Sequence, residues 1–187
     1  MKRIFALLII LSSIVLSQTQ VTITAIDSIT RPFNYTTYAA NDVVNDSTFT
    51  RMLRFKNTNI ITANDSGLVV NKGGAGIILS ALLTVGDTAN TANGNFKLLL
   101  FRDTVTNVAD NAAWATGAYY NTRQIGEIDF ALSNNGTASN YSYVTGLNIP
   151  FSCATDDRYL YGVLLAKAAF KPTVNQRIII KLGIIRN

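Results

Sequence analysis

Short apolar runs, each closed by a cluster of turn residues, recur along this chain and limit what it can fold into. Examples are VTITAI (Val21–Ile26), FKLLLF (Phe96–Phe101) and RIIIKLGII (Arg177–Ile185). Such runs either alternate with a period of two or are solidly apolar, and Ile, Val, Thr, Tyr and Phe favour a pleated, half-buried backbone. Segments dense in Gly, Asn, Asp and Thr, such as NKGGAG and SNNGTASN, lie between them and tolerate turn dihedrals.

The same pattern continues through the rest of the chain. Its other runs are FTRMLRF (Phe49–Phe55), GIILSALLTV (Gly76–Val85), QIGEIDFAL (Gln124–Leu132), YSYVTGLNI (Tyr141–Ile149) and RYLYGVLLAKAAF (Arg158–Phe170). Because about eight strands follow one another without a strand–helix rhythm, we predict an all-β fold, an antiparallel β-sandwich of jelly-roll type. Only residues Thr106–Tyr120 could hold one short helix. Sheet edges in such a fold need cover, so we expect a homo-oligomer or a lattice partner.

The amino terminus has the pattern of a secretory signal peptide. Lys2 and Arg3 precede the apolar run Ile4–Leu16, and residues suited to cleavage follow. The run has about 13 residues, whereas a membrane-spanning helix needs about 20. We predict that residues 1–17 are a signal peptide or hydrophobic segment, with a retained membrane anchor or an ordinary folded segment as alternatives. Residues 18–187 would then form a single β-sandwich domain.

Charge is scarce in this chain and is not concentrated anywhere. Charged residues make up 14% of the sequence, against roughly 25% in an average soluble domain, and 48% is hydrophobic. Asn, Thr and Ser must therefore cover much of the surface, which favours a rigid structural or extracellular β-protein over a cytosolic enzyme. The net charge is +5, but the basic residues form no run. We expect no nucleic-acid partner, and membrane contact only through the N-terminal segment if it is retained.

Residues for common enzyme chemistry are absent. The chain has no histidine, which removes Ser-His-Asp and Cys-His arrangements, HExxH zinc motifs and the commonest general base. Its one glutamate, Glu127, lies two residues from Asp129, so on a strand both carboxylates share a face about 7 Å apart. A glycosidase pair is conceivable at such a separation. Two solvent-facing residues on an amphipathic strand are the favoured interpretation.

The other candidate sites are also better explained by a structural role than by chemistry. Cys153 is alone, so no intrachain disulfide or CxxC motif exists, and we expect a small buried hydrophobe. The segment at Asp87 lacks the acidic ligands of a calcium loop, although calcium held there by loop carbonyls stays open. GGAG (Gly73–Gly76) leads into a strand and is not a phosphate loop. We therefore predict a non-enzyme with no catalytic, cofactor-binding or metal-binding residues and no cofactor.

Sequon asparagines and tyrosines are scattered along the chain. Glycosylation sequons occur by chance in a chain rich in Asn and Thr; they start at Asn34, Asn45, Asn64, Asn135 and Asn140. Tyrosines could line a carbohydrate or protein contact, although half-buried strand faces are favoured. The tyrosines concerned are Tyr119, Tyr120, Tyr141, Tyr143, Tyr159 and Tyr161.

Several phrases, read in order, carry a family resemblance. They are TRPFNYTTYAANDVVND, LRFKN, GGAGIILSALL, FKLLLFRD, VADNAAWA, IGEIDF, YLYGVLLAKAAFKPT and RIIIKLGII. Across about Ile29–Ile185 the chain resembles small virion-associated proteins of tailed bacteriophages. The resemblance implies a β-sandwich structural protein located in the virion, with other virion proteins as partners. It would decorate or stabilise the capsid, or occupy another head or tail position, and the family has no catalytic residues to carry over.

The resemblance also assigns structural roles to particular residues. It implies a turn at Gly73, Gly74 and Gly76, a local cap at Asp110 and Asn111, and strand packing at Tyr161 and Gly162. In YAANDVVN, we interpret Ala40–Asp42 as a turn that delivers Val43 and Val44 into the sandwich, with Tyr38 as an apolar anchor.

The N-terminal segment departs from this family, because soluble virion proteins need no signal peptide. An exported prophage-derived product, a virion with a membrane, or a hydrophobic arm that docks into the particle would each account for it. A secreted or surface-displayed adhesin that binds glycan or a host surface is the alternative function.

Overall fold

A computed structural model describes most of the chain from residue 21 onward. The described ranges are 21–30, 37–45, 52–57, 69–70, 72–86, 95–106, 108–115, 121–134, 139–173 and 176–186. The predicted segment 1–17 lies outside them, so its nature and the boundary at residue 18 stay predictions. Within these ranges no helix is both long enough and apolar enough to cross a bilayer.

Antiparallel β-strands account for the regular structure of the described ranges. They are β1 (Val21–Thr30), β2 (Val43–Val44), β3 (Leu53–Asn57), β4 (Ala75–Gly86), β5 (Asn95–Phe101), β6 (Gln124–Ala131), β7 (Ser133–Asn134), β8 (Ser139–Ser152), β9 (Leu160–Ala166) and β10 (Arg177–Arg186).

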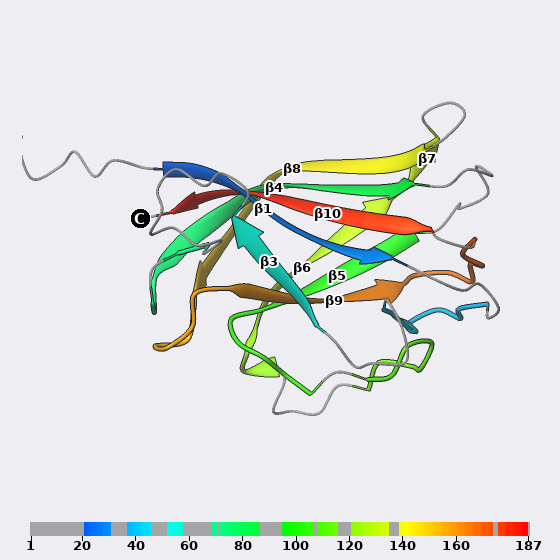
Figure 1. Cartoon of the computed structure of the whole chain (residues 1–187), viewed down its shortest axis with the longest axis horizontal. Coiled ribbons are helices and arrows are strands. Elements are labelled where there is room, and N and C mark those ends of the chain that lie inside the picture. Colours follow the sequence, from blue (N-terminus) through cyan, green and yellow to red (C-terminus); the bar gives the residue numbers. More distant parts are fainter. Residues whose placement is uncertain are drawn as a thin grey trace, which may run out of the picture.

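The strands form two layers (Figure 1). One layer has the order β1-β10-β4-β8, and the other has the order β3-β9-β5-β6. Strand β3 also pairs with β1, so the layers join along one path of strands, while short β2 and β7 pair with β9 and β8.

The pairing of the eight longer strands is nested. The first strand pairs with the last, β1 with β10; then β3 pairs with β9, β4 with β8, and β5 with β6. All four pairs are antiparallel, as in a single long hairpin wound around a barrel axis. This winding is the topology of a jelly roll, and it confirms the predicted fold class.

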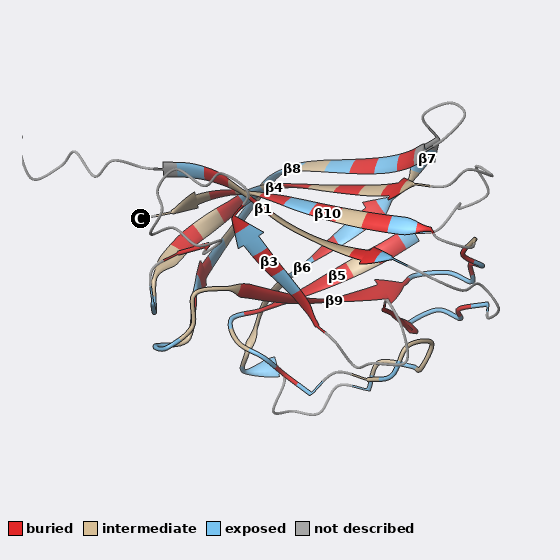
Figure 2. Cartoon of the chain, viewed as in Figure 1, coloured by how far each residue is buried: buried red, intermediate tan, exposed pale blue. Residues whose placement is uncertain are grey.

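The main core lies between the two layers. On β10 the inward residues Ile178, Ile180, Leu182 and Ile184 are buried, and they alternate with more exposed ones. Strand β9 differs, because all seven of its residues are buried (Figure 2). Its second face is covered by a separate apolar cluster. That cluster includes Val43, Met52, Leu99, Phe101, Val105, Tyr161, Val163 and Leu165, with Trp114 and Val108 packed against it.

The stretch Thr106–Tyr120, where a short helix could have formed, is irregular in its described part, residues 106 and 108–115. Asn111 has a φ of 58°, in the left-handed region that Asn tolerates better than most residues. Residues 111–114 instead bond to residues 41–43: the Val43 amide donates to the Ala112 carbonyl at 3.0 Å. This backbone pairing competes with helix formation and places the loop over β2.

Candidate interaction surfaces

Glu127 and Asp129 lie on one exposed face of β6, and each has a lysine partner. The Glu127 carboxylate is 3.0 Å from Lys97 Nζ, and the Asp129 carboxylate is 2.9 Å from Lys167 Nζ. About half of each acidic side chain is exposed. The hydrogen bond that Lys97 donates to the Glu127 carboxylate raises the pKa of Lys97. This geometry is that of solvent-facing ion pairs, which add little stability, rather than of an acid and a base around a sugar bond.

Cys153 is buried at the end of the sandwich where β8 leads to β9. Its thiol donates to the Tyr159 carbonyl at 3.4 Å. Burial, with a smaller contribution from the nearby Asp157 carboxylate, raises the pKa of Cys153 to about 12. Because the thiolate is the nucleophilic form, this cysteine is chemically inert at neutral pH, as expected for a small buried hydrophobe.

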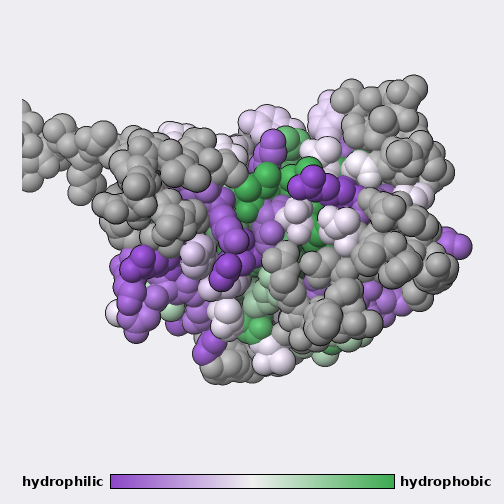
Figure 3. All heavy atoms as spheres, viewed as in Figure 1, coloured by the Kyte–Doolittle hydropathy of each residue, from purple (hydrophilic) through white to green (hydrophobic). Residues whose placement is uncertain are grey.

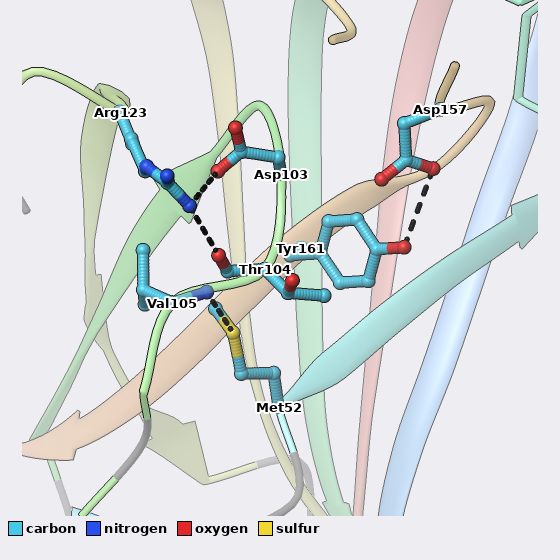
Figure 4. A network of polar contacts seen from close by, with 7 residues as sticks. All are labelled: Met52, Asp103, Thr104, Val105, Arg123, Asp157 and Tyr161. Atoms are coloured by element: carbon cyan, nitrogen blue, oxygen red, sulfur yellow. Dashed lines mark hydrogen bonds and ion pairs between the residues drawn. The ribbon is translucent and has the colours of Figure 1, made fainter.

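Asp157 organises the loop between β8 and β9. Its carboxylate accepts hydrogen bonds from the backbone amides of Arg158 and Tyr159, at 2.7 and 3.2 Å, and from the Tyr161 hydroxyl at 3.3 Å (Figure 4). Burial and this hydrogen bond raise the pKa of Tyr161. The Arg54 guanidinium lies 4.8 Å from the Tyr159 ring centre. These contacts hold one loop shape and leave Tyr161 protonated.

The loop after β5 is fixed to the same end of the molecule. Arg123 Nη1 donates to the Asp103 carboxylate at 3.1 Å and to the Thr104 carbonyl at 2.9 Å, and the Val105 amide lies 3.2 Å from Met52 Sδ (Figure 4). An open polar hollow of about 580 Å³ lies at this end. Its lining is Lys72, Gly73, Arg102, Ser152, Cys153, Ala154 and Thr155. The described lining residues include no carboxylate, and Cys153 among them is inert, so these residues do not combine an acid with a base.

The segment YAANDVVN forms the predicted turn, but only Val44 joins the main core between the layers, whereas Val43 joins the separate apolar cluster on the second face of β9. Residues 40 and 41 form a turn in which Asn41 has a φ of 70°, and Val43 and Val44 are buried beyond it. Asp42 accepts a hydrogen bond from the Ala39 amide at 2.6 Å. Tyr38 is fully buried, and its ring stacks on Phe170 at a centroid distance of 4.9 Å.

Asp110 locks this turn to the loop between β5 and β6. Its Oδ1 atom accepts from the Tyr38 hydroxyl at 2.7 Å and from the Asn45 amide at 2.8 Å. The resemblance implied a local cap at Asp110 and Asn111, whereas these two contacts of Asp110 are long-range. Periodicity could not have revealed them, because the partners lie far apart in the sequence.

The remaining candidates divide into buried, exposed and undescribed residues. The sequon asparagines Asn45 and Asn140 are only 3% and 2% exposed, so folding would hide both from glycosylation. Asn34, Asn64, Asp87, Tyr119, Tyr120 and Asn135 lie outside the described residues. Tyr161 is buried and Tyr159 is half-buried, but Tyr141 and Tyr143 are 39% and 61% exposed.

Those two tyrosines belong to the outer face of the β1-β10-β4-β8 layer. Paired residues on neighbouring strands point to the same side of a sheet, so each row of the outer face can be followed across the strands. One row is Lys56, Ile26, Lys181, Leu82 and Tyr143; the next is Ser28, Ile179, Thr84 and Tyr141. In the space-filling view, hydrophobic residues reach the surface beside strongly hydrophilic ones (Figure 3).

Comparisons with known proteins add little to this description. No protein-family model and no curated protein matches the chain. A crystal structure of tomato aspermy virus matches at 11% identity with a TM-score of 0.35, covering 100% of this chain and 96% of that one. A single-particle structure of maize chlorotic mottle virus matches at 15% identity with a TM-score of 0.29, covering 90% and 92%. At such scores neither likeness carries an argument, and the jelly-roll assignment rests on the strand pairing.

Proposed function

We propose that this chain is a non-enzymatic structural protein of a virus particle. The observation that carries the proposal is the nested pairing of eight strands into two layers. Jelly rolls of this kind are used by viral shells, lectins and cupins. Cupin chemistry commonly relies on histidine ligands, which this sequence lacks. Because a fold alone does not determine function, the choice between shell protein and lectin-like binder needs further support.

The support for a shell role comes from how the loops are held. Asp157, Arg123 and Asp110 each form two or more hydrogen bonds that restrain a connecting segment. Rigid loops suit repeated contacts between identical or neighbouring subunits, since little conformational entropy is lost when such contacts form. We propose contacts with other virion proteins, homo-oligomerisation and a location in the particle. The finer proposal, decoration or stabilisation of a tailed-phage capsid, rests on the sequence resemblance.

A secreted or surface-displayed adhesin is the second candidate. Its support is the exposed pair Tyr141 and Tyr143, whose rings lie on one face of β8 and could stack on a sugar. The signal-like segment 1–17 is the other observation that favours it.

Particle fractionation tests the first proposal. Virions purified on a density gradient should contain peptides of this chain at a constant ratio to the major shell protein, with a cytosolic protein of the host as the negative control. Amino-terminal sequencing of the particle-bound chain would also show whether residues 1–17 are kept. Absence from particles, together with no binding of the purified protein to isolated capsids, would overturn the proposal. A glycan-array signal with a cell-surface location would favour the adhesin.

A further inference from the structure

The outer face of the β1-β10-β4-β8 layer brings together basic residues that are scattered in the sequence. Lys56 on β3 and Lys181 on β10 share a row with Tyr143, and Arg177 lies on the same side two rows away. All three basic residues are exposed. Neighbouring rows are about 7 Å apart along a strand and neighbouring strands about 4.8 Å apart, so Lys56 and Lys181 lie about one Debye length apart, and Arg177 lies about 14 Å from Lys181, far enough to contact a separate phosphate.

No acidic residue occupies an outward position of this face in the described part of β1, β4, β8 and β10. The outward positions contain Thr22, Thr24, Ile26, Ser28, Ile77, Leu79, Ser80, Leu82, Thr84, Tyr141, Tyr143, Thr145, Arg177, Ile179, Lys181 and Ile185. The nearest carboxylate on these strands, Asp27, accepts from the backbone amides of Ser28 and Arg54. Asp27 lies in the opposite register of β1, so the charged residues at the described outward positions of this face are all basic.

The protruding side chains of the face are aromatic rather than aliphatic. Tyr143 and Tyr141 are the most exposed of its large apolar residues, at 61% and 39%, and Leu79 follows at 37%, whereas Ile26, Ile179 and Leu82 are only partly exposed between their neighbours. Hydroxyl groups of Ser28, Thr84 and others fill the positions between the cations and the rings. A sheet face that has two exposed rings, three cations and many hydroxyls, and no carboxylate at its described outward positions, offers stacking for bases and charge for phosphates.

We propose that this face binds single-stranded nucleic acid. The tyrosine rings stack on unpaired bases, while Lys56, Lys181 and Arg177 contact the phosphates. A duplex would hide its bases from the rings. A second copy of the chain is disfavoured because two such faces would oppose like charges. An anionic membrane is disfavoured because the aliphatic side chains of this face other than Leu79 are recessed.

This proposal departs from the expectation of no nucleic-acid partner. That expectation rested on the absence of a basic run, but sheet pairing, not sequence proximity, gathers these cations. The proposal goes beyond a role in a particle and does not depend on it.

Fluorescence anisotropy of the full chain with labelled 20-nucleotide oligo(dT) and oligo(U) tests it, and the two probes show whether DNA or RNA is preferred. We expect saturable binding to at least one probe, and weaker binding to a duplex of equal length. With three phosphate contacts, log Kd should change with log salt with a slope of about 2. Lys181→Gln should lower this slope by about 0.7. Lys72→Gln, the same change at an exposed lysine off this face, should leave it unaltered.

Two variants of Tyr143 distinguish stacking of a base on its ring from a nonspecific apolar contact. Tyr143→Leu should weaken binding by roughly tenfold because base stacking is lost. Tyr143→Phe keeps the ring and should bind within about twofold of the unchanged protein. Thermal melts of each variant report whether the fold is kept.

Four outcomes would overturn the proposal. They are no anisotropy change at low salt, duplex binding as tight as single-strand binding, equal losses for Lys72→Gln and Lys181→Gln, and binding to anionic vesicles but not to either oligonucleotide. Failure here would leave the particle-fractionation result unaffected, so the two proposals can fail separately.

Discussion

Replacing Tyr38 by Phe should destabilise the protein measurably although it removes a single oxygen atom. The Tyr38 hydroxyl donates to the Asp110 carboxylate at 2.7 Å, and its ring is fully buried and stacked on Phe170. Phenylalanine keeps the ring, its volume and the stacking, so the change isolates the hydrogen bond. A hydrogen bond to a charged group contributes about 1.5–3 kcal/mol.

The lower part of that range applies to this bond. Asp110 is only partly buried and still accepts from the Asn45 amide at 2.8 Å, so its carboxylate is not left isolated. We expect Tyr38→Phe to lower the free energy of unfolding by about 1.5 kcal/mol. For a chain of this length that corresponds to a decrease in Tm of roughly 3–6 °C. Asp110→Ala should cost more, about 3 kcal/mol, because it leaves two donors without this acceptor.

Urea unfolding of the two single variants and the double variant completes a thermodynamic cycle. If the contact is as described, the double variant should be more stable than the sum of the single effects predicts, by about 1 kcal/mol or more. Strict additivity, or a loss below about 0.5 kcal/mol for Tyr38→Phe, would refute the claim that Asp110 locks the turn to the loop.

Three further changes test other parts of the structure. Gly76→Ala should cost about 2 kcal/mol or more in urea unfolding, because its Cβ would lie 2.6 Å from the Ile185 carbonyl oxygen, whereas Gly86→Ala, with 3.7 Å to its nearest atom, should be nearly neutral. Equal costs at both glycines would contradict the close approach. Asn41→Ala should cost about 1 kcal/mol in the same assay and Asn41→Gly almost nothing, since this residue has a φ of 70°. Burial raises the pKa of Cys153 to about 12. The stability that this protonated thiol contributes is therefore fully present below about pH 8.5 and is lost by about 1.4 kcal/mol per pH unit up to pH 12. The difference in unfolding free energy between the unchanged protein and Cys153→Ala should follow that slope, and a pH-independent difference would speak against a buried thiol.

Local patterns in the sequence predicted much of the architecture. Alternating and solidly apolar runs indicated antiparallel strands, and β10 and β4 alternate as their patterns require. Turn chemistry was equally informative at Tyr38–Asn45, because Asn is one of the few residues that tolerates the left-handed region. The burial of Cys153 and the solvent-facing position of Glu127 were also predicted from composition and period alone.

Two local predictions were incomplete because long-range contacts override local preference. The possible helix within Thr106–Tyr120 is replaced, in its described part, by pairing with residues 41–43. A local cap was expected at Asp110, whereas its bonds to Tyr38 and Asn45 reach across the fold.

The sequence by itself determined that this chain forms strands, where many of them turn, and which side of a strand faces the core, since each depends on residues a few positions apart. Only the tertiary structure decided which strands are neighbours and in what register. That register places Lys56 and Lys181 in one row with Tyr143, and it leaves the described outward positions of β1, β4, β8 and β10 without a carboxylate. Pairing between distant strands depends on how the whole core packs, so a surface built by such pairing is absent from any local pattern.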